Sequence, residues 1–402
     1  MRAIPLKYTL FPVFLLLWPV AAQTVNLDDL LHFRQYRAID GLSSEEVSDL
    51  TQDHNGFLWI AGKGGLQRFD GRDFRSYPLG DGESQGSPDL TALCAELSAH
   101  DTLLWIGSRK GLYMMELTSE RIRFFPVNGA DSSGSVAHVH ALLSGNDGTL
   151  WVGLRGGGLA RMVERPSPAN NFQPRFKFYL SGTGGNHLSN NFVRRLYQDT
   201  QGNIWIATSF GLSVFNPRLE RFHNYFYKPG DPSSISSNSV FAIAGDSRGR
   251  IWVSTLGGSG LQQALVDSGG RVRFKRYRSG SPDSLGHSVI FDIHVDKQDR
   301  LWLASAGGGL IRYDGRRFVH FRAREKNAAS LTSNNLFRLY EDRAGGLWVA
   351  SISDGLSHAA DIYPDSFFLR QLTPENSPLR DDHIHSIVQD RMGRIWTGTE
   401  KG

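Results

Sequence analysis

Basic side chains stand in three glycine-rich segments, each of which begins three residues after a tryptophan. The segments GKGG, SRKG and LRGGG contain Lys63, Arg109, Lys110 and Arg155. The corresponding segments SFG, LGGSG, AGGG and ISDG, further along the chain, carry no cation. Guanidinium groups bind carboxylates through paired hydrogen bonds, and clustered cations attract anions. The four residues are therefore a candidate ligand-binding site for an anion, with solvated turn charges as the alternative.

A second set of charges interrupts apolar segments, ten residues before a tryptophan in each case. The set consists of Asp49, Arg195, Asp292 and Arg338. An unpaired charge in a protein interior is costly, so we expect these side chains to line a wet central channel or to pair across it. A structural ring of ion pairs and a contribution to ligand binding both remain open as interpretations.

Two His-x-His pairs, His138/His140 and His383/His385, invite a metal interpretation. Residues i and i+2 of a strand share a face, so each pair could supply two imidazoles. No third ligand stands nearby, and the pairs fall in different repeats, so we assign no metal and no cofactor. The sequence contains no G-x-S-x-G, H-E-x-x-H or Walker motif, and no helix follows the GGG runs. We expect no catalytic residues in this chain.

These residues lie in a sequence unit that repeats along the chain and contains one tryptophan in each copy. Each repeat tryptophan follows Leu or Ile and precedes, by two positions, Ala, Gly or Ser. A spacing of 46 to 54 residues separates successive members of the series. A period of about 40–50 residues is typical of propellers and solenoids. The series is Trp59, Trp105, Trp151, Trp205, Trp252, Trp302, Trp348 and Trp396.

Each repeat predicts four short strands. An apolar segment ends in a turn of the form Asp-x-x-Gly, as at Asp199 and Gly202. Repeats two and six, with AHDTLLW and DKQDRLW, lack the turn glycine. The second strand, residues 204–208, is apolar on both faces, which indicates packing from both sides. The resulting fold class is all-β: a seven-bladed β-propeller of four-stranded blades, plus the start of a further blade or second propeller. An eight-bladed ring is the competing count.

The N-terminus has the pattern of a secretory signal. Arg2 and Lys7 precede an apolar segment, and Val20 and Ala22 fit the −3 and −1 positions of a cleavage site. The apolar segment is shorter than the roughly 20 residues needed to span a bilayer. We therefore expect a signal peptide at 1–22, a seven-bladed propeller at 30–372, and the opening hairpin of a truncated eighth repeat at 373–402. An uncleaved signal-anchor is the alternative.

The repeat string D-x-x-G-x-[LI]-W-[IV]-[AG]-[ST]-x-x-G-[G]-L-x-x-[FY]-[DN] resembles the two-component regulator propeller repeats. The lead-ins ISSNSV, LTSNNLF and LSNNFV strengthen this resemblance, which covers roughly residues 30–402. The family forms the periplasmic sensor half of hybrid histidine kinases and of related diguanylate cyclase receptors. Its repeats close as seven-bladed propellers, followed by a membrane helix and a cytoplasmic output domain. Because Gly402 falls inside the last repeat, we expect the chain to be a fragment.

The resemblance implies a periplasmic ligand-sensing region whose kinase or cyclase activity belongs to a missing C-terminal part. The expected partner is a small-molecule or oligosaccharide ligand, with an anion among the candidates. The full-length receptor is expected to be an inner-membrane homodimer. A net charge of +4 without a basic stripe predicts no nucleic-acid partner. A propeller lyase, using a histidine near an arginine, and a protein-interaction scaffold are the alternatives, because fold alone does not decide function.

Overall fold

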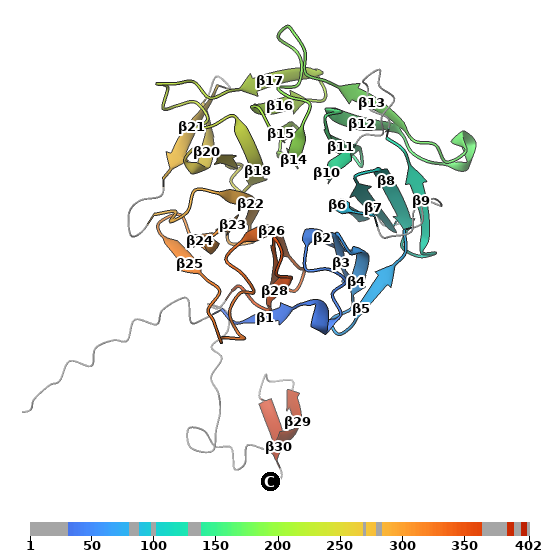
Figure 1. The fold of residues 1–402 in the computed structure, drawn as a ribbon, viewed down its shortest axis with the longest axis vertical. Coiled ribbons are helices and arrows are strands. Elements are labelled where there is room, and N and C mark those ends of the chain that lie inside the picture. Colours follow the sequence, from blue (N-terminus) through green and yellow to red (C-terminus); the bar gives the residue numbers. More distant parts are fainter. Residues whose placement is uncertain are drawn as a thin grey trace, which may run out of the picture.

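The computed structural model describes residues 31–79, 88–97, 102–127, 138–267, 271–278, 284–363, 384–389 and 395–399. Within these ranges seven antiparallel four-stranded sheets stand around a central axis (Figure 1). The predicted all-β, seven-bladed propeller of four-stranded blades is therefore confirmed, and the eight-bladed count is wrong. Helix is limited, in the described part, to the 3₁₀ turns Ala38–Asp40 and Pro168–Asn170.

The strands of the first four blades run from the axis to the rim in chain order. Blade 1 contains β2 (Val47–Gln52), β3 (Leu58–Gly62), β4 (Gly65–Phe69) and β5 (Phe74–Tyr77). Blade 2 contains β6 (Leu90–Leu97), β7 (Thr102–Ser108), β8 (Gly111–Glu116) and β9 (Arg121–Phe125). Blade 3 contains β10 (His138–Ser144), β11 (Leu150–Arg155), β12 (Leu159–Glu164) and β13 (Arg175–Tyr179). Blade 4 contains β14 (Val193–Gln198), β15 (Ile204–Thr208), β16 (Leu212–Asn216) and β17 (Arg221–Tyr225).

The last three blades follow the same order, except at the rim of blade 7. Blade 5 contains β18 (Ser239–Gly245), β19 (Ile251–Leu256), β20 (Gly260–Val266) and β21 (Val272–Tyr277). Blade 6 contains β22 (Ile290–Val295), β23 (Leu301–Ser305), β24 (Gly309–Tyr313) and β25 (Phe318–Phe321). Blade 7 contains β26 (Leu336–Glu341), β27 (Leu347–Ser351), β28 (Leu356–Ala359) and β1 (Phe33–Tyr36).

Blade 7 takes its outer strand from the beginning of the described chain, and this exchange closes the ring. Strand β1 pairs antiparallel with β28, so that Tyr36 lies opposite Leu356. The Tyr36 ring stacks on Trp348 of blade 7 at 5.4 Å and meets Phe69 of blade 1 at 5.2 Å. A closed ring of this kind leaves no open edge between its first and last blades.

The second strand of each blade is packed on both faces, as the sequence predicts. Every residue of the second strand is buried in blades 1, 4, 6 and 7. In blades 3 and 5 every residue of that strand except the last is buried. Apolar clusters form between neighbouring blades; one of them joins Trp151 of blade 3 to Val193 and Ile206 of blade 4. The small residue two positions after the tryptophan is required by this contact. A Cβ on Gly153 would stand 2.6 Å from a methyl carbon of Val193.

A buried hydrogen bond joins the tryptophan to the turn that precedes its strand. In five blades the indole N–H donates to an aspartate six residues earlier, at 2.8–3.2 Å. The other oxygen of Asp199 accepts the backbone N–H groups of Gln201 and Asn203, at 2.9 Å each. The aspartate thus fixes the turn and the tryptophan together. The pairs are Asp53–Trp59, Asp199–Trp205, Asp246–Trp252, Asp296–Trp302 and Asp342–Trp348.

Blade 6 keeps this turn although its sequence lacks the glycine. Asp299 adopts a left-handed φ of 60° in the glycine position, and its N–H donates to the Asp296 carbonyl at 2.9 Å. Aspartate tolerates this conformation better than most residues do. Repeat six therefore differs from the other repeats in the residue at this position, and not in the geometry of the turn. In blade 3 the aspartate itself is missing, because Gly145 occupies its place. The turn of blade 2 lies outside the described residues.

The last two strands, β29 (Ile384–Gln389) and β30 (Ile395–Thr399), form a two-stranded sheet. In the described part of the chain they pair with each other and with no blade of the ring. The expected hairpin around Trp396 is therefore present. The predicted signal peptide at 1–22 and the linking segment at 364–383 lie outside the described residues.

Replacement of Asp199 by Ala should lower the free energy of unfolding by about 1–3 kcal/mol, because the buried Trp205 indole N–H then lacks an acceptor. Urea denaturation of the parent and the variant measures the change. Asp70→Ala is the matched control, since Asp70 accepts two turn N–H groups at 2.8 Å but is exposed and holds no tryptophan. Equal effects of the two substitutions would contradict the role assigned to the indole bond.

Candidate functional site

The structure brings together the four charged residues predicted at the axis. Arg195 of blade 4 donates to both oxygens of Asp292 of blade 6, at 2.9 and 3.0 Å. Its guanidinium also lies 3.9 Å from Asp49 of blade 1, and Arg338 of blade 7 lies 3.6 Å from the same carboxylate. The two acids and two arginines thus form one neutral ion-pair cluster across the channel, built from four different blades.

Backbone groups complete the coordination of this cluster. Asp49 accepts the N–H of Leu93 at 2.9 Å, and Asp292 accepts the N–H of Leu339 at 3.1 Å. Burial lowers the pKa of Arg338 to about 10. Burial also works to lower the pKa of Arg195, but the carboxylates of Asp292 and Asp49 outweigh it and raise that pKa. The arginines stay charged at neutral pH and hold the inner strands of opposite blades together.

The other blades place alanine at the position of the charged residues. Asp49, Arg195, Asp292 and Arg338 all pair with the small residue that follows the repeat tryptophan by two positions. Ala92 of blade 2 and Ala141 of blade 3 occupy the same register. A blade of this fold therefore does not require a charged residue at this layer.

A β-bulge precedes this layer in every inner strand of the ring. The register shifts by one residue in all seven blades. A bulge turns an extra side chain out of the regular alternation. We call the face that carries the loop between the second and third strands of each blade the upper face. The bulge lies nearer to this face than the layer of charged residues does. The bulge residues are Ser48, Thr91, His140, Arg194, Phe241, Phe291 and Phe337.

The predicted cationic site lies on the upper face, and its members differ in their partners. Lys63 is 3.0 Å from Glu46, and Arg109 is 3.2 Å from Asp89, so each has an acidic neighbour of its own. Arg155 has no acidic partner among the described residues and lies over the Phe192 ring at 5.2 Å. Lys110 is exposed beside Arg109. The acids that reduce the positive charge come from distant turns, which the local sequence pattern does not reveal.

The His138/His140 pair stands on the first strand of blade 3, with ring centres 5.6 Å apart. Burial lowers the pKa of His138 to about 4 and that of His140 to about 3, and nearby arginines add to the effect. Both imidazoles are therefore neutral at neutral pH. Groups of three or more metal-ligating side chains are absent from the described part of the chain. His383 lies outside the described residues.

The Asn-containing lead-ins have a structural role. Asn191 accepts the N–H of Ser181 with its side chain, and its carbonyl accepts the N–H groups of Gly156 and Gly158. Asn238 and Asn334 make the equivalent bonds in the next lead-ins. These residues connect the outer strand of one blade to the following blade. They position the site without belonging to it.

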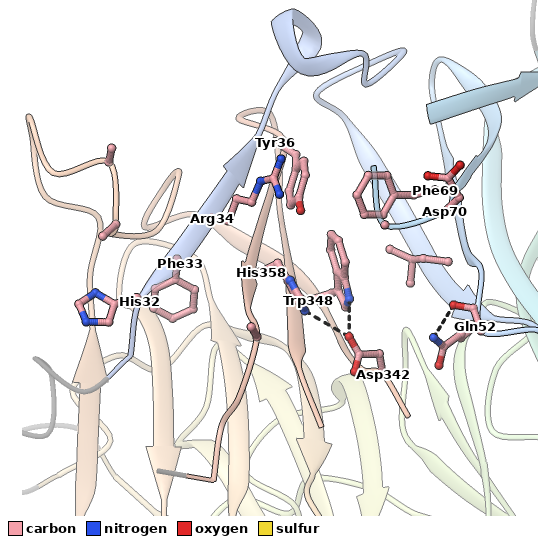
Figure 2. Close-up of a pocket in the computed structure, with 16 residues that line it drawn as sticks. His32, Phe33, Arg34, Tyr36, Gln52, Phe69, Asp70, Asp342, Trp348 and His358 are labelled. Atoms are coloured by element: carbon pink, nitrogen blue, oxygen red, sulfur yellow. Dashed lines mark hydrogen bonds and ion pairs between the residues drawn. The ribbon is translucent and has the colours of Figure 1, made fainter. Parts of the chain in front are cut away.

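A pocket of about 750 Å³ lies at the rim, where blade 7 meets blade 1 (Figure 2). Gly56 and Gly71, which line it, sit in turns on the face opposite to the upper face. Asp342 accepts hydrogen bonds from Trp348 and from His358, whose ring stacks on the indole at 4.0 Å. Asp342 and His358 thus serve the blade's own aspartate–tryptophan pair. Arg34 lies over the Tyr36 ring, and Gln52 donates to the Gly56 carbonyl. We therefore attribute this pocket to ring closure rather than to ligand binding.

The model of the two component regulator propeller family matches residues 41–64, 187–210, 234–257 and 378–401. Each matched segment contains the first and second strands of one repeat. Four segments of the chain thus match the repeat model of this family. A stretch of 45 residues, 11% of this chain, is 44% identical to Histidine kinase P4 of Formosa agariphila and spans 3% of that protein.

Solved structures show the same propeller at low identity. The extracellular domain of a protein described as a hybrid two component system of B. thetaiotaomicron matches 92% of this chain and 44% of that chain, with a TM-score of 0.62 and 20% identity. Virginiamycin B lyase from Staphylococcus aureus matches 81% of this chain and 98% of that chain, with a TM-score of 0.59 and 11% identity. At these identities the likeness concerns the fold. Within the described residues, no helix is long and apolar enough to cross a membrane.

Replacement of Asp292 by Ala should destabilise the propeller by about 3–5 kcal/mol, because Arg195 is left buried without its nearest carboxylate. Urea unfolding at neutral pH measures the effect. The double variant Asp292→Ala/Arg195→Ala should recover part of this loss, since alanine occupies the same layer in other blades. A single variant as stable as the parent would show that the cluster is not needed for folding.

The stability of the propeller should depend on pH through His140. Its folded-state pKa of about 3 lies below the usual 6.5, so between these values the unfolded state binds the extra proton. Stability is then lost as pH falls, by roughly 1.4 kcal/mol per pH unit for one such group. His140→Thr, with the residue type that blade 2 has at this position, should flatten the profile between pH 6.5 and pH 4. Parallel profiles for parent and variant would contradict the assignment.

Proposed function

We propose that this chain is the ligand-sensing propeller of a membrane signal-transduction receptor of the histidine kinase or diguanylate cyclase type. The observation that supports the proposal most strongly is the set of four matched regulator propeller repeats, set in a closed seven-bladed ring. The fold likeness to an extracellular domain of a two component system agrees with it. In this proposal the output activity lies outside these 402 residues.

The proposed location is the periplasm. The Val20-x-Ala22 site favours export with cleavage after Ala22. A later segment of the full-length receptor would supply the inner-membrane anchor, and the receptor would act as a homodimer. Signals would then reach the propeller from outside the cytoplasm and pass through the membrane to the output domain.

The proposed ligand is a small molecule or an oligosaccharide with negative charge, bound at the upper face. Arg155 carries the strongest support, because it is exposed and has no acidic partner among the described residues. Lys63, Arg109 and Lys110 extend the positive charge over blades 1 and 2. The axial ion-pair cluster contributes no net charge, so attraction for an anion comes from the upper-face cations.

A lyase is the second candidate. The likeness to virginiamycin B lyase and the His138/His140 pair near arginines favour it. However, a general base works best with a pKa near the operating pH, and pKa values of about 3 and 4 lie well below that range. A protein-interaction scaffold is also compatible with the fold, since PorZ, a surface component of a Porphyromonas gingivalis secretion system, is structurally similar at a TM-score of 0.58. The matched repeats favour the sensor.

An antibody raised against the propeller should detect, in fractionated cells, a membrane-bound polypeptide larger than 44.7 kDa. Protease added to spheroplasts should digest its propeller, because the proposal places this part outside the cytoplasm. N-terminal sequencing should begin at Gln23. A protease-protected protein, a soluble protein of 44.7 kDa, or one that retains Met1 would contradict the proposal.

A further inference from the structure

The bulge residues around the mouth of the channel differ sharply between blades. Blades 1 and 2 have the small hydroxyl residues Ser48 and Thr91, whereas blades 5, 6 and 7 have Phe241, Phe291 and Phe337. Since serine and threonine serve at the same position of the same fold, the propeller does not require an aromatic ring there. Three consecutive phenylalanines at the mouth therefore need another explanation.

These rings form one continuous surface. Phe241 and Phe291 are 5.2 Å apart between ring centres, and Phe291 and Phe337 are 5.8 Å apart. The Arg194 guanidinium lies 4.0 Å from the centre of Phe241 and 5.3 Å from that of Phe192. We call Phe192, Phe241, Phe291 and Phe337 the phenylalanine arc; it runs over blades 4 to 7.

The phenylalanine arc is not part of the structural core. None of its members belongs to the seven apolar clusters that join neighbouring blades among the described residues. All four side chains are partly exposed. A concave apolar wall with a few convergent polar groups is the usual form of a small-molecule site.

Two arginines without acidic partners flank the arc. Arg155 lies 5.2 Å from the Phe192 ring centre, and Arg194 lies on the same ring at 5.3 Å. No described carboxylate is within ion-pair distance of either one, in contrast to Lys63 and Arg109. Arg194 uses one nitrogen to donate to Ser239 and to the Val240 carbonyl. The Arg194 guanidinium is thus held in place and has spare donors for an anion. Arg155 is exposed, and its guanidinium lies over the Phe192 ring.

The ion-pair cluster forms the floor of this site. Arg338, a member of the cluster, lies 4.6 Å from the Phe337 ring centre, so the floor begins directly below the arc. The wall near blade 3 is completed by His140, 5.3 Å from Phe192. One nitrogen of His138 and one of His140 are buried without a hydrogen-bond partner in the described structure. The site thus combines an apolar wall with two guanidinium groups that have no acidic partner among the described residues.

We propose that the channel mouth binds an aromatic carboxylate, with its ring on the phenylalanine arc and its carboxylate at Arg155 and Arg194. Aromatic rings favour offset or edge contacts with other rings, and guanidinium pairs with carboxylates in a two-bond geometry. The arc itself offers no hydroxyl or amide group. It therefore has no groups that would select a sugar by hydrogen bonds to its hydroxyl groups. This inference rests on the proposed sensor function and specifies its ligand.

Isothermal titration calorimetry of the full chain tests the proposal with cinnamate, indole-3-acetate, neutral cinnamyl alcohol and glucuronate. Cinnamate or indole-3-acetate should bind, and cinnamyl alcohol and glucuronate should bind at least tenfold more weakly. Phe291→Ser and Arg155→Gln should each weaken binding of the aromatic acid tenfold or more. Phe241→Thr replaces Phe291→Ser if the latter does not fold, as judged by thermal unfolding.

One matched control comes from the same face and one from the rim. Phe210→Ser removes an exposed phenylalanine from the upper loop of blade 4, outside the arc. Lys177→Gln removes a cation of the outer strand β13 that pairs with Glu220. Both should leave the affinity within twofold of the parent. Lack of binding by both aromatic acids, or equal losses in the controls, would overturn the site. Tighter binding of glucuronate than of the aromatic acids would overturn the ligand class. Failure of the proposed sensor function would appear separately, in the cell-fractionation and protease experiment.

Discussion

Every blade of this propeller is packed on both of its faces, and this constraint decides where functional side chains can stand. The second strand is fully buried in blade after blade, and a single Cβ at Gly153 would already collide with Val193 of the next blade. Side chains in such close-packed contacts cannot be varied freely. Only the turns, the outer strands and the edge facing the axis remain available for ligand chemistry.

The repeats also provide an internal comparison, because each position occurs in seven blades. Positions with a structural task keep their residue type: the aspartate before the tryptophan recurs in five blades, with the same indole hydrogen bond. The two layers at the axis behave differently. The layer of the ion-pair cluster has alanine in some blades and a charged residue in others. The layer of bulge residues varies from serine, as at Ser48, to phenylalanine, as at Phe337. Variation within a fixed fold separates the residues that serve this protein from those that serve any propeller.

The fold could be predicted from the sequence because the period is long, regular and marked by a residue with a buried role. The position of the axial charges could also be predicted, since their constant distance in sequence from the tryptophan places them at one level of the ring. Two features escaped this reasoning. The bulge adds one residue to each inner strand, so a simple alternation places Phe241 and Phe291 incorrectly. The acidic partners of Lys63 and Arg109 lie 17 and 20 residues away, in loops that only the folded ring brings near.

The ion-pair cluster has a consequence for the kind of site that the channel can offer. Two acids and two arginines from blades 1, 4, 6 and 7 meet across the axis, and their backbone contacts fix them in place. Breaking such a buried pair leaves an uncompensated charge, so an anion that enters the mouth gains nothing by passing deeper. The neutral floor repels neither sign strongly, whereas Arg155 and Arg194 favour an anion at the rim of the arc. In the proposed site the ligand would therefore stay at the mouth, above the ion-pair cluster.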